Sequence, residues 1–524
     1  MEPLRSRTFR WLWIAQFASN TGTWAQTVGA QWLMGDLGGG PLLVALVQTA
    51  TSLPIFLLVL PAGALGDIFD RRRLLLGAQG LMLAGAGGLA LITSAGRMTP
   101  ELLLVLIALV GAGQALALPS FQAVQPELVP RALLPQATLL NGATFNVARA
   151  VGPALGGVLI ATAGPAATFG LNAVSFLGVI AVVAAWRRPE DQRTLGAEHV
   201  RSALIAGARY VASAPRFRRI LGRNALFVLP ASALWALLPV LARGPLGLGS
   251  GGYGLLFGSV GLGALAGAFV LTRLRARIGP SGLVAVATSS YALALLVIGL
   301  SGSVAATVPA LVVAGLSWVG VLSTLNAAAQ QILPDWTRAR SLAFYTLVFM
   351  GGQALGSILW GLVAARAGLD AAWAIAAVLL VLGGVVGVRL LALADSPLEV
   401  GRVQFGADPE GAGDAPHGAG PVLVTAEWRV ARHDAAAFLA AMEPVGRSRR
   451  RTGAQRWGLF RDVADPEVYV ETFTVATWGE HLRQHLERGT LGDQEHDARA
   501  RALTVDGMGP RVRHALWPYG REEP

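Results

Sequence analysis

A row of amide and hydroxyl side chains in the first apolar segment is the clearest group able to bind a ligand. These residues recur every three or four positions, at Gln16, Asn20, Thr23, Thr27 and Gln31. At 3.6 residues per turn they share one face of a helix. Because polar groups are costly against lipid, we expect this face to line a water-filled cavity. Hydrogen bonding between helices is an equal alternative for any single one.

Other polar side chains within apolar segments are expected to line the same cavity. Arg149 is the one basic residue that the pattern places well inside such a segment. An intramembrane charge needs a carboxylate, a carbonyl or a substrate anion as its partner. The alternative is that Arg149 lies near a membrane face and extends toward water. The uncharged members of this set are Gln114, Gln122, Asn224, Asn326 and Gln330.

Histidine and cysteine usage limits the metal and cofactor chemistry. His481 and His485 stand one helical turn apart, a spacing that can bind a metal. Solvent-exposed positions on a charged helix are the favoured interpretation, so we predict no metal site and no cofactor. The chain has no cysteine, which excludes disulfides, thiolate metal sites and thiol nucleophiles. It also lacks lysine and a GxxxxGK[ST] motif, so it is not expected to use ATP directly.

The elements that position these residues are apolar helices. Hydrophobic residues make up 53% of the 524 and charged ones 14%, which rules out a wholly water-soluble protein. Windows of about 20 apolar residues, the length that crosses a bilayer, predict twelve transmembrane helices. They lie at about 10–35, 42–65, 74–95, 101–124, 137–162, 166–186, 217–242, 252–272, 282–301, 306–330, 340–364 and 371–394.

The net charge of +11 records the topology of the membrane part. Residues 1–394 carry +15 and residues 395–524 carry −4, and the arginines of the membrane part gather mainly in alternate loops. Positively charged short loops stay in the cytoplasm, so both termini are expected there. The basic excess therefore gives no reason to expect a nucleic-acid partner.

The chain divides into five predicted parts. Residues 1–186 and 217–394 form two six-helix bundles, and GPALGG at Gly152 recurs as GQALGS at Gly352. Duplicated units of this kind are typical of secondary transporters. The loop 187–216 connects them and contains either an amphipathic helix on the inner leaflet or an ordinary linker helix. Residues 395–421 read as a flexible linker, and the β-α-β-β-α-β order of 422–524 predicts a small ferredoxin-like α+β domain.

The loop after the second apolar segment, GALGDIFDRRRLL, resembles the signature of the major facilitator superfamily. In that family the acidic residue caps a neighbouring helix and joins a charge cluster that latches the cytoplasmic side. The resemblance assigns this role to Gly63, Asp67, Arg71, Arg72 and Arg73, although Ile68 and Asp70 depart from the pattern. The alternative is that three arginines simply follow the positive-inside rule.

The fifth apolar segment resembles the antiporter motif of the same superfamily. Its matching residues are Gly152, Pro153, Gly156 and Gly157. The resemblance implies export and a tight contact with helices of the second half. The proline and glycines by themselves predict a bend and close helix approach.

Nearly the whole chain is similar to the bacterial branch of this superfamily that contains enterobactin and macrolide exporters, the transmembrane secretion effectors. The resemblance implies a place in a bacterial inner membrane. It also implies export of a sizeable amphipathic molecule, a siderophore, a macrolide or another drug, by alternating access and driven by protons. No acidic residue lies deep in a span, which leaves Asp36, Asp67 and Glu127 as proton-coupling candidates. The tail is similar to small dimeric α+β barrels, which allows self-association. A membrane-anchored enzyme or a sensor that uses this tail is the alternative.

Overall fold

The computed structural model describes residues 2–68, 70–186, 200–393, 416, 418–505, 507 and 509–518. Side chains at 63–68, 122, 123, 125–127, 131, 200–206, 268, 335 and 339 are not described. The predictions for the side chains of Gly63, Asp67, Gln122 and Glu127, and for most of the linker 395–421, therefore lie outside the described part. Two compact units are present, unit 1 (Met1–Val200, Arg219–Ala327, Ala343–Leu393) and unit 2 (Arg201–Arg218, Ala328–Leu342, Ala394–Pro524).

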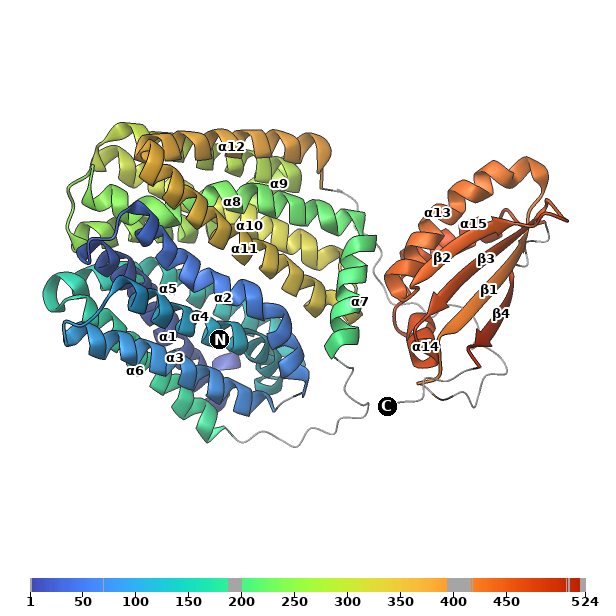
Figure 1. The fold of residues 1–524 in the computed structure, drawn as a ribbon, viewed down its shortest axis with the longest axis horizontal. Coiled ribbons are helices and arrows are strands. Elements are labelled where there is room, and N and C mark those ends of the chain that lie inside the picture. The colour runs from blue at the N-terminus through green and yellow to red at the C-terminus, as the bar shows by residue number, and fades with distance from the viewer. Residues whose placement is uncertain are drawn as a thin grey trace. The chain divides into compact units, whose positions relative to one another are not determined.

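Six long helices form the first half of unit 1 (Figure 1). Side-chain caps start three of them, because Ser6, Asp70 and Thr99 each accept a hydrogen bond from a backbone N–H of the first turn. α1 packs against α5 and α6, and α3 packs against α4 and α6. The helices are α1 (Arg7–Asp36), α2 (Pro41–Ile68), α3 (Arg71–Ser94), α4 (Pro100–Leu128), α5 (Leu134–Ala163) and α6 (Pro165–Ala185).

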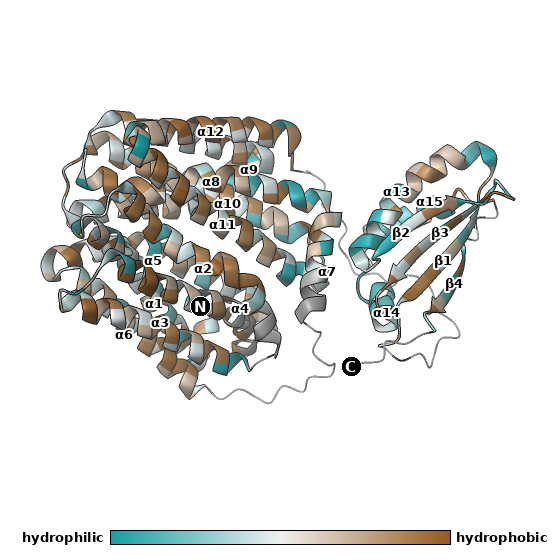
Figure 2. Cartoon of the chain, in the orientation of Figure 1, coloured by the Kyte–Doolittle hydropathy of each residue, from teal (hydrophilic) through white to brown (hydrophobic). Residues whose placement is uncertain are grey.

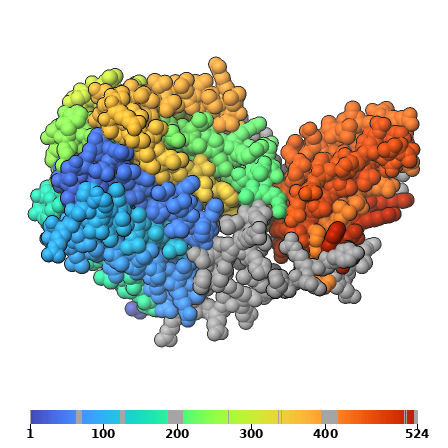
Figure 3. All heavy atoms as spheres, in the orientation of Figure 1, coloured from blue at the N-terminus to red at the C-terminus, as the bar shows by residue number. Residues whose placement is uncertain are grey.

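Helices from the second half pack beside the first in unit 1, and Figure 3 shows these halves, blue and green to orange, in contact. The predicted spans 252–272 and 282–301 are two helices within α9 that meet at a kink at Gly279, where φ is 69°. A positive φ is accessible to glycine at little cost, so the chain turns there without a loop. The helices are α8 (Pro215–Arg243), α9 (Ser250–Ser301), α10 (Val304–Ile332), α11 (Asp335–Ala367) and α12 (Leu369–Leu390).

Ten helices in the described parts are long and apolar enough to cross a membrane. The predicted spans at 10–35 and 252–272 are not among them. For α1 the reason is its polar face, which lowers the mean hydropathy of a 30-residue helix. Figure 2 shows that apolar residues predominate along the helices of unit 1. The multi-helix membrane fold is confirmed, and the number twelve is not.

The C-terminal part of unit 2 is a four-stranded antiparallel sheet with helices on one face (Figure 1). The sheet order β2-β3-β1-β4 and the order of elements along the chain are those of a ferredoxin-like domain, with two helices between β3 and β4. Unit 2 also contains most of α7 (Val200–Ser213). The tail elements are β1 (Val422–Arg429), α13 (Ala435–Thr452), β2 (Arg456–Arg461), β3 (Val468–Val475), α14 (Trp478–Leu486), α15 (Leu491–Arg501) and β4 (Arg511–Leu516).

Candidate functional site

A cavity of about 470 Å³ lies within unit 1, between the two helical halves. Its wall combines side chains from α1 to α6 with side chains from α8, α10 and α11. Small-molecule sites typically enclose about 300–1,000 Å³ and combine an apolar wall with a few polar groups. The size of this cavity and its place between the two halves suit a small-molecule ligand.

The polar face of α1 forms one wall of this cavity. Gln16, Asn20, Thr23 and Thr27 all line it, and so does Gln114 of α4. The amide of Gln16 donates to Asn20 at 3.4 Å, and the hydroxyl of Thr23 donates to Asn172 at 3.4 Å. The first bond lies within α1 and the second joins α1 to α6, so Thr23 both faces the cavity and bonds between helices.

The remaining uncharged residues of the set lie elsewhere. Gln31 is buried one turn beyond the cavity, where its Nε2 donates to the Trp235 carbonyl at 3.0 Å and its Oε1 accepts from the Tyr253 hydroxyl. Asn224 is fully buried and donates to the Tyr345 carbonyl at 3.4 Å. Gln31 thus joins α1 to α8 and α9. The other two, half-buried Asn326 and exposed Gln330, are not among the residues that line the cavity.

Arg149 of α5 lies in the cavity wall and is 7% exposed. Its Nη2 donates to Asn146 at 2.9 Å, and its guanidinium carbon is 5.9 Å from the centre of the Phe145 ring. The Nε atom is buried without a hydrogen-bond partner, and no carboxylate in the described part of the chain pairs with this side chain. Arg149 is therefore a buried cation that faces the cavity with donor capacity to spare.

Sequence reasoning missed a second set of polar residues and the whole aromatic part of the cavity wall. Gln48 of α2 donates to Gln353 of α11 at 2.8 Å, which links the two halves across the cavity. Each of these two glutamines is an isolated amide inside an apolar segment, and that is the signal that could have identified them. The missed polar residues are Ser19, Gln48, Thr51, Ser52, Gln79 and Gln353, and the missed aromatic ones are Trp24, Phe121, Phe145, Phe176, Trp235, Trp318 and Phe349.

The glycines of the fifth helix lie at two different helix contacts. A Cβ on Gly152 or Gly156 would lie within 3 Å of α1 atoms, and one on Gly157 would lie 2.8 Å from the Cα of Gly254 in α9. In the repeated motif, Gly356 makes the corresponding close approach to α8 at Leu229. The first-half motif thus packs against its own half and against the second half at once.

One of the basic residues after α2, Arg72, binds the end of a helix within the first half. Arg72 donates from Nε to the Val183 carbonyl at 3.0 Å and from Nη2 to the Ala184 carbonyl, both at the carboxyl end of α6. Asp70, which departs from the superfamily pattern, accepts from the Arg73 backbone N–H at 2.9 Å and caps α3. A cation at the carboxyl end of a helix stabilises its unpaired carbonyls.

An ion pair joins the two halves at the end of the bundle where α1 and α8 both end. Asp36 accepts from Arg243 Nη2 at 2.7 Å, and the same guanidinium donates to the Trp32 carbonyl at 3.0 Å. The guanidinium carbon also lies 4.2 Å from the centre of the Trp32 ring. Asp36, a proton-coupling candidate, thus carries a carboxylate that bonds the first half to the second.

Burial in the tail corrects the expectation that His481 is solvent-exposed. Its side chain is 0% exposed, because α14 packs the face formed by Trp478, His481 and His485 toward the sheet. Burial lowers the pKa of His481 to about 3, with smaller contributions from His485 and His514, so the ring is neutral at pH 7. Leaving a buried polar group unpaired costs about 1–3 kcal/mol, and neither ring nitrogen of His481 has a partner in the described part.

Comparison with known proteins places this geometry in a family. The model of the transmembrane secretion effector family matches residues 1–522. The enterobactin exporter of Citrobacter koseri is 30% identical over 331 residues, which cover 61% of this chain and 76% of that protein. The enterobactin exporter of Escherichia coli O127:H6 is 28% identical over 329 residues with the same coverage.

Solved structures support the fold. A POT family transporter in complex with 5-aminolevulinic acid superposes with a TM-score of 0.60 at 14% identity, covering 73% of this chain and 95% of its own. A nucleoside transporter gives a TM-score of 0.59 at 12% identity, with 73% and 99% covered. These relatives and fold neighbours are transporters, so the enzyme alternative is set aside. The chain belongs to the transmembrane secretion effector family of the major facilitator superfamily, and it is a multi-pass membrane transporter with a small-molecule substrate.

Proposed function

We propose that this protein is a proton-coupled exporter that carries a sizeable amphipathic small molecule across the inner membrane. The observation that carries the proposal is the cavity of about 470 Å³ between the two halves, with the polar face of α1 on one side and buried Arg149 beside it. Rocking of two halves about such a site gives alternating access. The exporter relatives support outward transport as the direction.

Twelve spans and cytoplasmic termini are part of this proposal. α1 has 30 residues and, at 1.5 Å per residue, is about 45 Å long, which exceeds the roughly 30 Å hydrocarbon core. Its polar residues face the cavity instead of lipid, which removes the usual cost of placing them in a membrane. The part of α9 before Gly279 is also long enough to cross. An even number of spans agrees with both termini on the arginine-rich side.

The cavity chemistry narrows the substrate class. Trp24, Trp235 and Trp318 offer flat apolar surfaces, and the amides of α1 offer hydrogen bonds. Arg149 supplies a cation without a protein carboxylate as partner in the described part. We therefore propose a large aromatic or macrocyclic substrate that carries an anionic or strongly hydrogen-bonding group, of the size of a siderophore or macrolide.

The latch and the proton pathway remain proposals from the superfamily pattern. Gly63, Asp67 and Arg71 to Arg73 are proposed to form a latch at the arginine-rich side. Asp36, Asp67 and Glu127 are proposed as proton-coupling groups. Among them the structure describes the side chain of Asp36 only, which is bonded to Arg243. Protonation of this carboxylate would remove its charge and weaken the ion pair with Arg243. Protonation would in this way be linked to separation of the halves.

Transport into inverted membrane vesicles tests this function. Vesicles that contain the protein and carry an imposed proton gradient are expected to accumulate labelled enterobactin or a labelled macrolide. An uncoupler should abolish this accumulation. Vesicles without the protein are the control. Uptake that persists after the uncoupler would overturn proton coupling, and no uptake of either class would overturn the proposed substrate range.

Self-association through the tail is a separate proposal. The face of the sheet that the helices leave uncovered carries Leu423 and Phe460, which are 41% and 60% exposed. Exposed apolar side chains on an uncovered sheet face favour contact with another copy, although polar residues such as Glu427 and Arg513 lie on the same face. Light scattering of the detergent-solubilised chain, compared with the Phe460→Ser variant, tests it. A wild-type chain that stays monomeric at all concentrations overturns it.

A further inference from the structure

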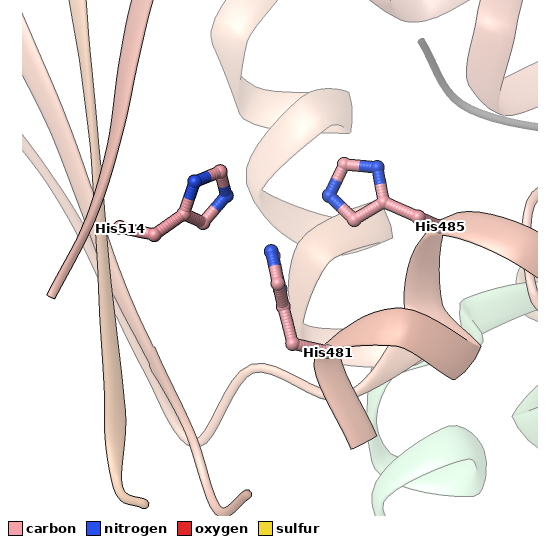
Figure 4. Close-up of side chains that lie close together, drawn as sticks. All are labelled: His481, His485 and His514. Atoms are coloured by element: carbon pink, nitrogen blue, oxygen red, sulfur yellow. The ribbon is translucent and has the colours of Figure 1, made fainter. Parts of the chain in front are cut away.

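Three histidines of the tail point toward one another from two elements (Figure 4). His481 and His485 lie on successive turns of α14, and His514 lies on β4. One nitrogen from each ring can be chosen so that all three lie within 4.8 Å of one another. The centre of the His481 ring is 4.6 Å from the centre of the His485 ring and 4.8 Å from the centre of the His514 ring.

The fold holds these side chains in place by backbone structure. A separation of four residues puts His481 and His485 on one face of α14. β4 pairs with β1 so that His514 stands opposite Val424, whose side chain is buried on the helix-covered side of the sheet. His514 therefore points toward α14. The cluster rests on a helix and a strand, which position ligands more rigidly than loops do.

Two of the three histidines, His481 and His514, have ring nitrogens that the described part of the chain leaves without a hydrogen bond. Both ring nitrogens of His481 and Nε2 of His514 are buried without a hydrogen-bond partner in the described part of the chain. Buried polar atoms are rarely left in this state, and a missing ion is one of the recognised reasons. A purely structural histidine would be expected to bond a carbonyl or a carboxylate instead.

We propose that His481, His485 and His514 form a binding site for one divalent transition-metal ion, with Zn²⁺ as the representative member. Imidazole nitrogens are the ligands that Zn²⁺ and its first-row neighbours prefer. Three protein ligands leave a fourth position for water or another molecule. Half-buried His485 and His514 form the side of the site that an ion can enter.

Closing the site requires small movements only. With Zn–N bonds of 2.0–2.1 Å and tetrahedral angles, ligand nitrogens lie about 3.4 Å apart. The nitrogens would therefore approach one another by at most roughly 1.4 Å, which rotation of the imidazole rings can supply. The Gln484 Oε1 atom, also buried without a hydrogen-bond partner, is a candidate acceptor for the second N–H of a bound histidine.

Metal titration of the full chain tests the site. The protein is purified in detergent without a polyhistidine tag, stripped with a chelator and titrated with Zn²⁺ in a calorimeter. We expect one Zn²⁺ per chain. His485→Ala and His514→Ala are each expected to weaken binding by at least tenfold, since each removes one of three ligands. His433→Ala is the matched control, because His433 lies in the same domain with an 81% exposed side chain.

X-ray absorption at the zinc edge of the wild-type complex gives an answer that does not depend on variant folding. Three imidazole nitrogens at about 2.0–2.1 Å support the site. A shell of oxygen ligands only, or binding that His433→Ala weakens as much as His485→Ala does, would overturn it. Failure of wild-type protein to bind Zn²⁺ would also overturn it. None of these outcomes depends on transport, so the exporter proposal is tested separately.

Discussion

Asp36 at the end of α1 and Arg243 at the end of α8 form an ion pair of 2.7 Å between the two halves of the membrane unit. The pair lies at the same end as the Gln31 bonds to α8 and α9 and the close approach of Gly157 to Gly254. Contacts between the halves therefore close this end of the cavity. Under the proposed orientation it is the end that faces away from the cytoplasm.

Removing this ion pair should open that end more often. Both side chains are partly exposed, 45% for Asp36 and 36% for Arg243, and exposed ion pairs contribute about 0.2–1 kcal/mol. Because the chain has no cysteine, Thr27→Cys introduces a single thiol in the cavity wall. In this background Asp36→Asn should raise the labelling rate by a membrane-impermeant maleimide up to about fivefold. Asp370→Asn, at an exposed helix start, should leave the labelling rate unchanged. An equal increase in the two variants would show that the ion pair between Asp36 and Arg243 does not hold this end closed.

Substituting Gly157 should disturb the contact between α5 and α9. An added methyl group would lie 2.8 Å from the Gly254 Cα and from the Ser250 carbonyl oxygen. Overpacking of this kind costs about 1–3 kcal/mol, so Gly157→Ala should lower the thermal midpoint and the transport rate. Gly142→Ala in the same helix has open space around it and should be neutral or stabilising. Equal losses in both variants would show that the contact is not the cause.

Arg149 should set the preference for substrates that carry negative charge. Arg149→Gln removes the buried cation from the cavity, and we expect it to reduce vesicle uptake of an anionic substrate by at least about tenfold. A hydrogen bond to a charged group contributes about 1.5–3 kcal/mol, which supports this size. Arg149→Lys should retain part of the uptake, and Arg97→Gln, at an exposed position, should retain all of it. Equal effects on an uncharged macrolide would indicate a structural role instead.

Arg449 should be essential for the stability of the tail. It bonds to fully buried Glu471 at 3.2 Å and to Asp497 at 3.1 Å, so Arg449→Met would leave two buried carboxylates with fewer partners. Loss of one partner of a buried pair costs about 3–5 kcal/mol. Amide hydrogen exchange in peptides from the sheet of the full chain should therefore become faster by about a hundredfold or more. Arg447→Met, which breaks an exposed i,i+4 pair with Glu443, should change exchange little.

The sequence by itself determined the membrane class, the repeat of the glycine motif and the ferredoxin-like order of the tail. Each depends on local pattern: apolar length, spacing along one helix face, and alternation of strand and helix. The shared face of Gln16, Asn20, Thr23 and Thr27 belongs to this group, because helical periodicity alone puts them together.

Tertiary structure decided which of the polar residues meet and which histidines gather. Gln16 and Gln31 lie on the same face of α1, and Gln16 lines the cavity. Gln31 instead bonds to α8 and α9, because the second half approaches α1 at that level. His514 lies 29 residues beyond His485 in the sequence, and only the pairing of β4 with β1 brings it to α14. Contacts between segments that are distant in the sequence depend on how whole helices and strands pack. No local sequence pattern specifies which of these segments come together.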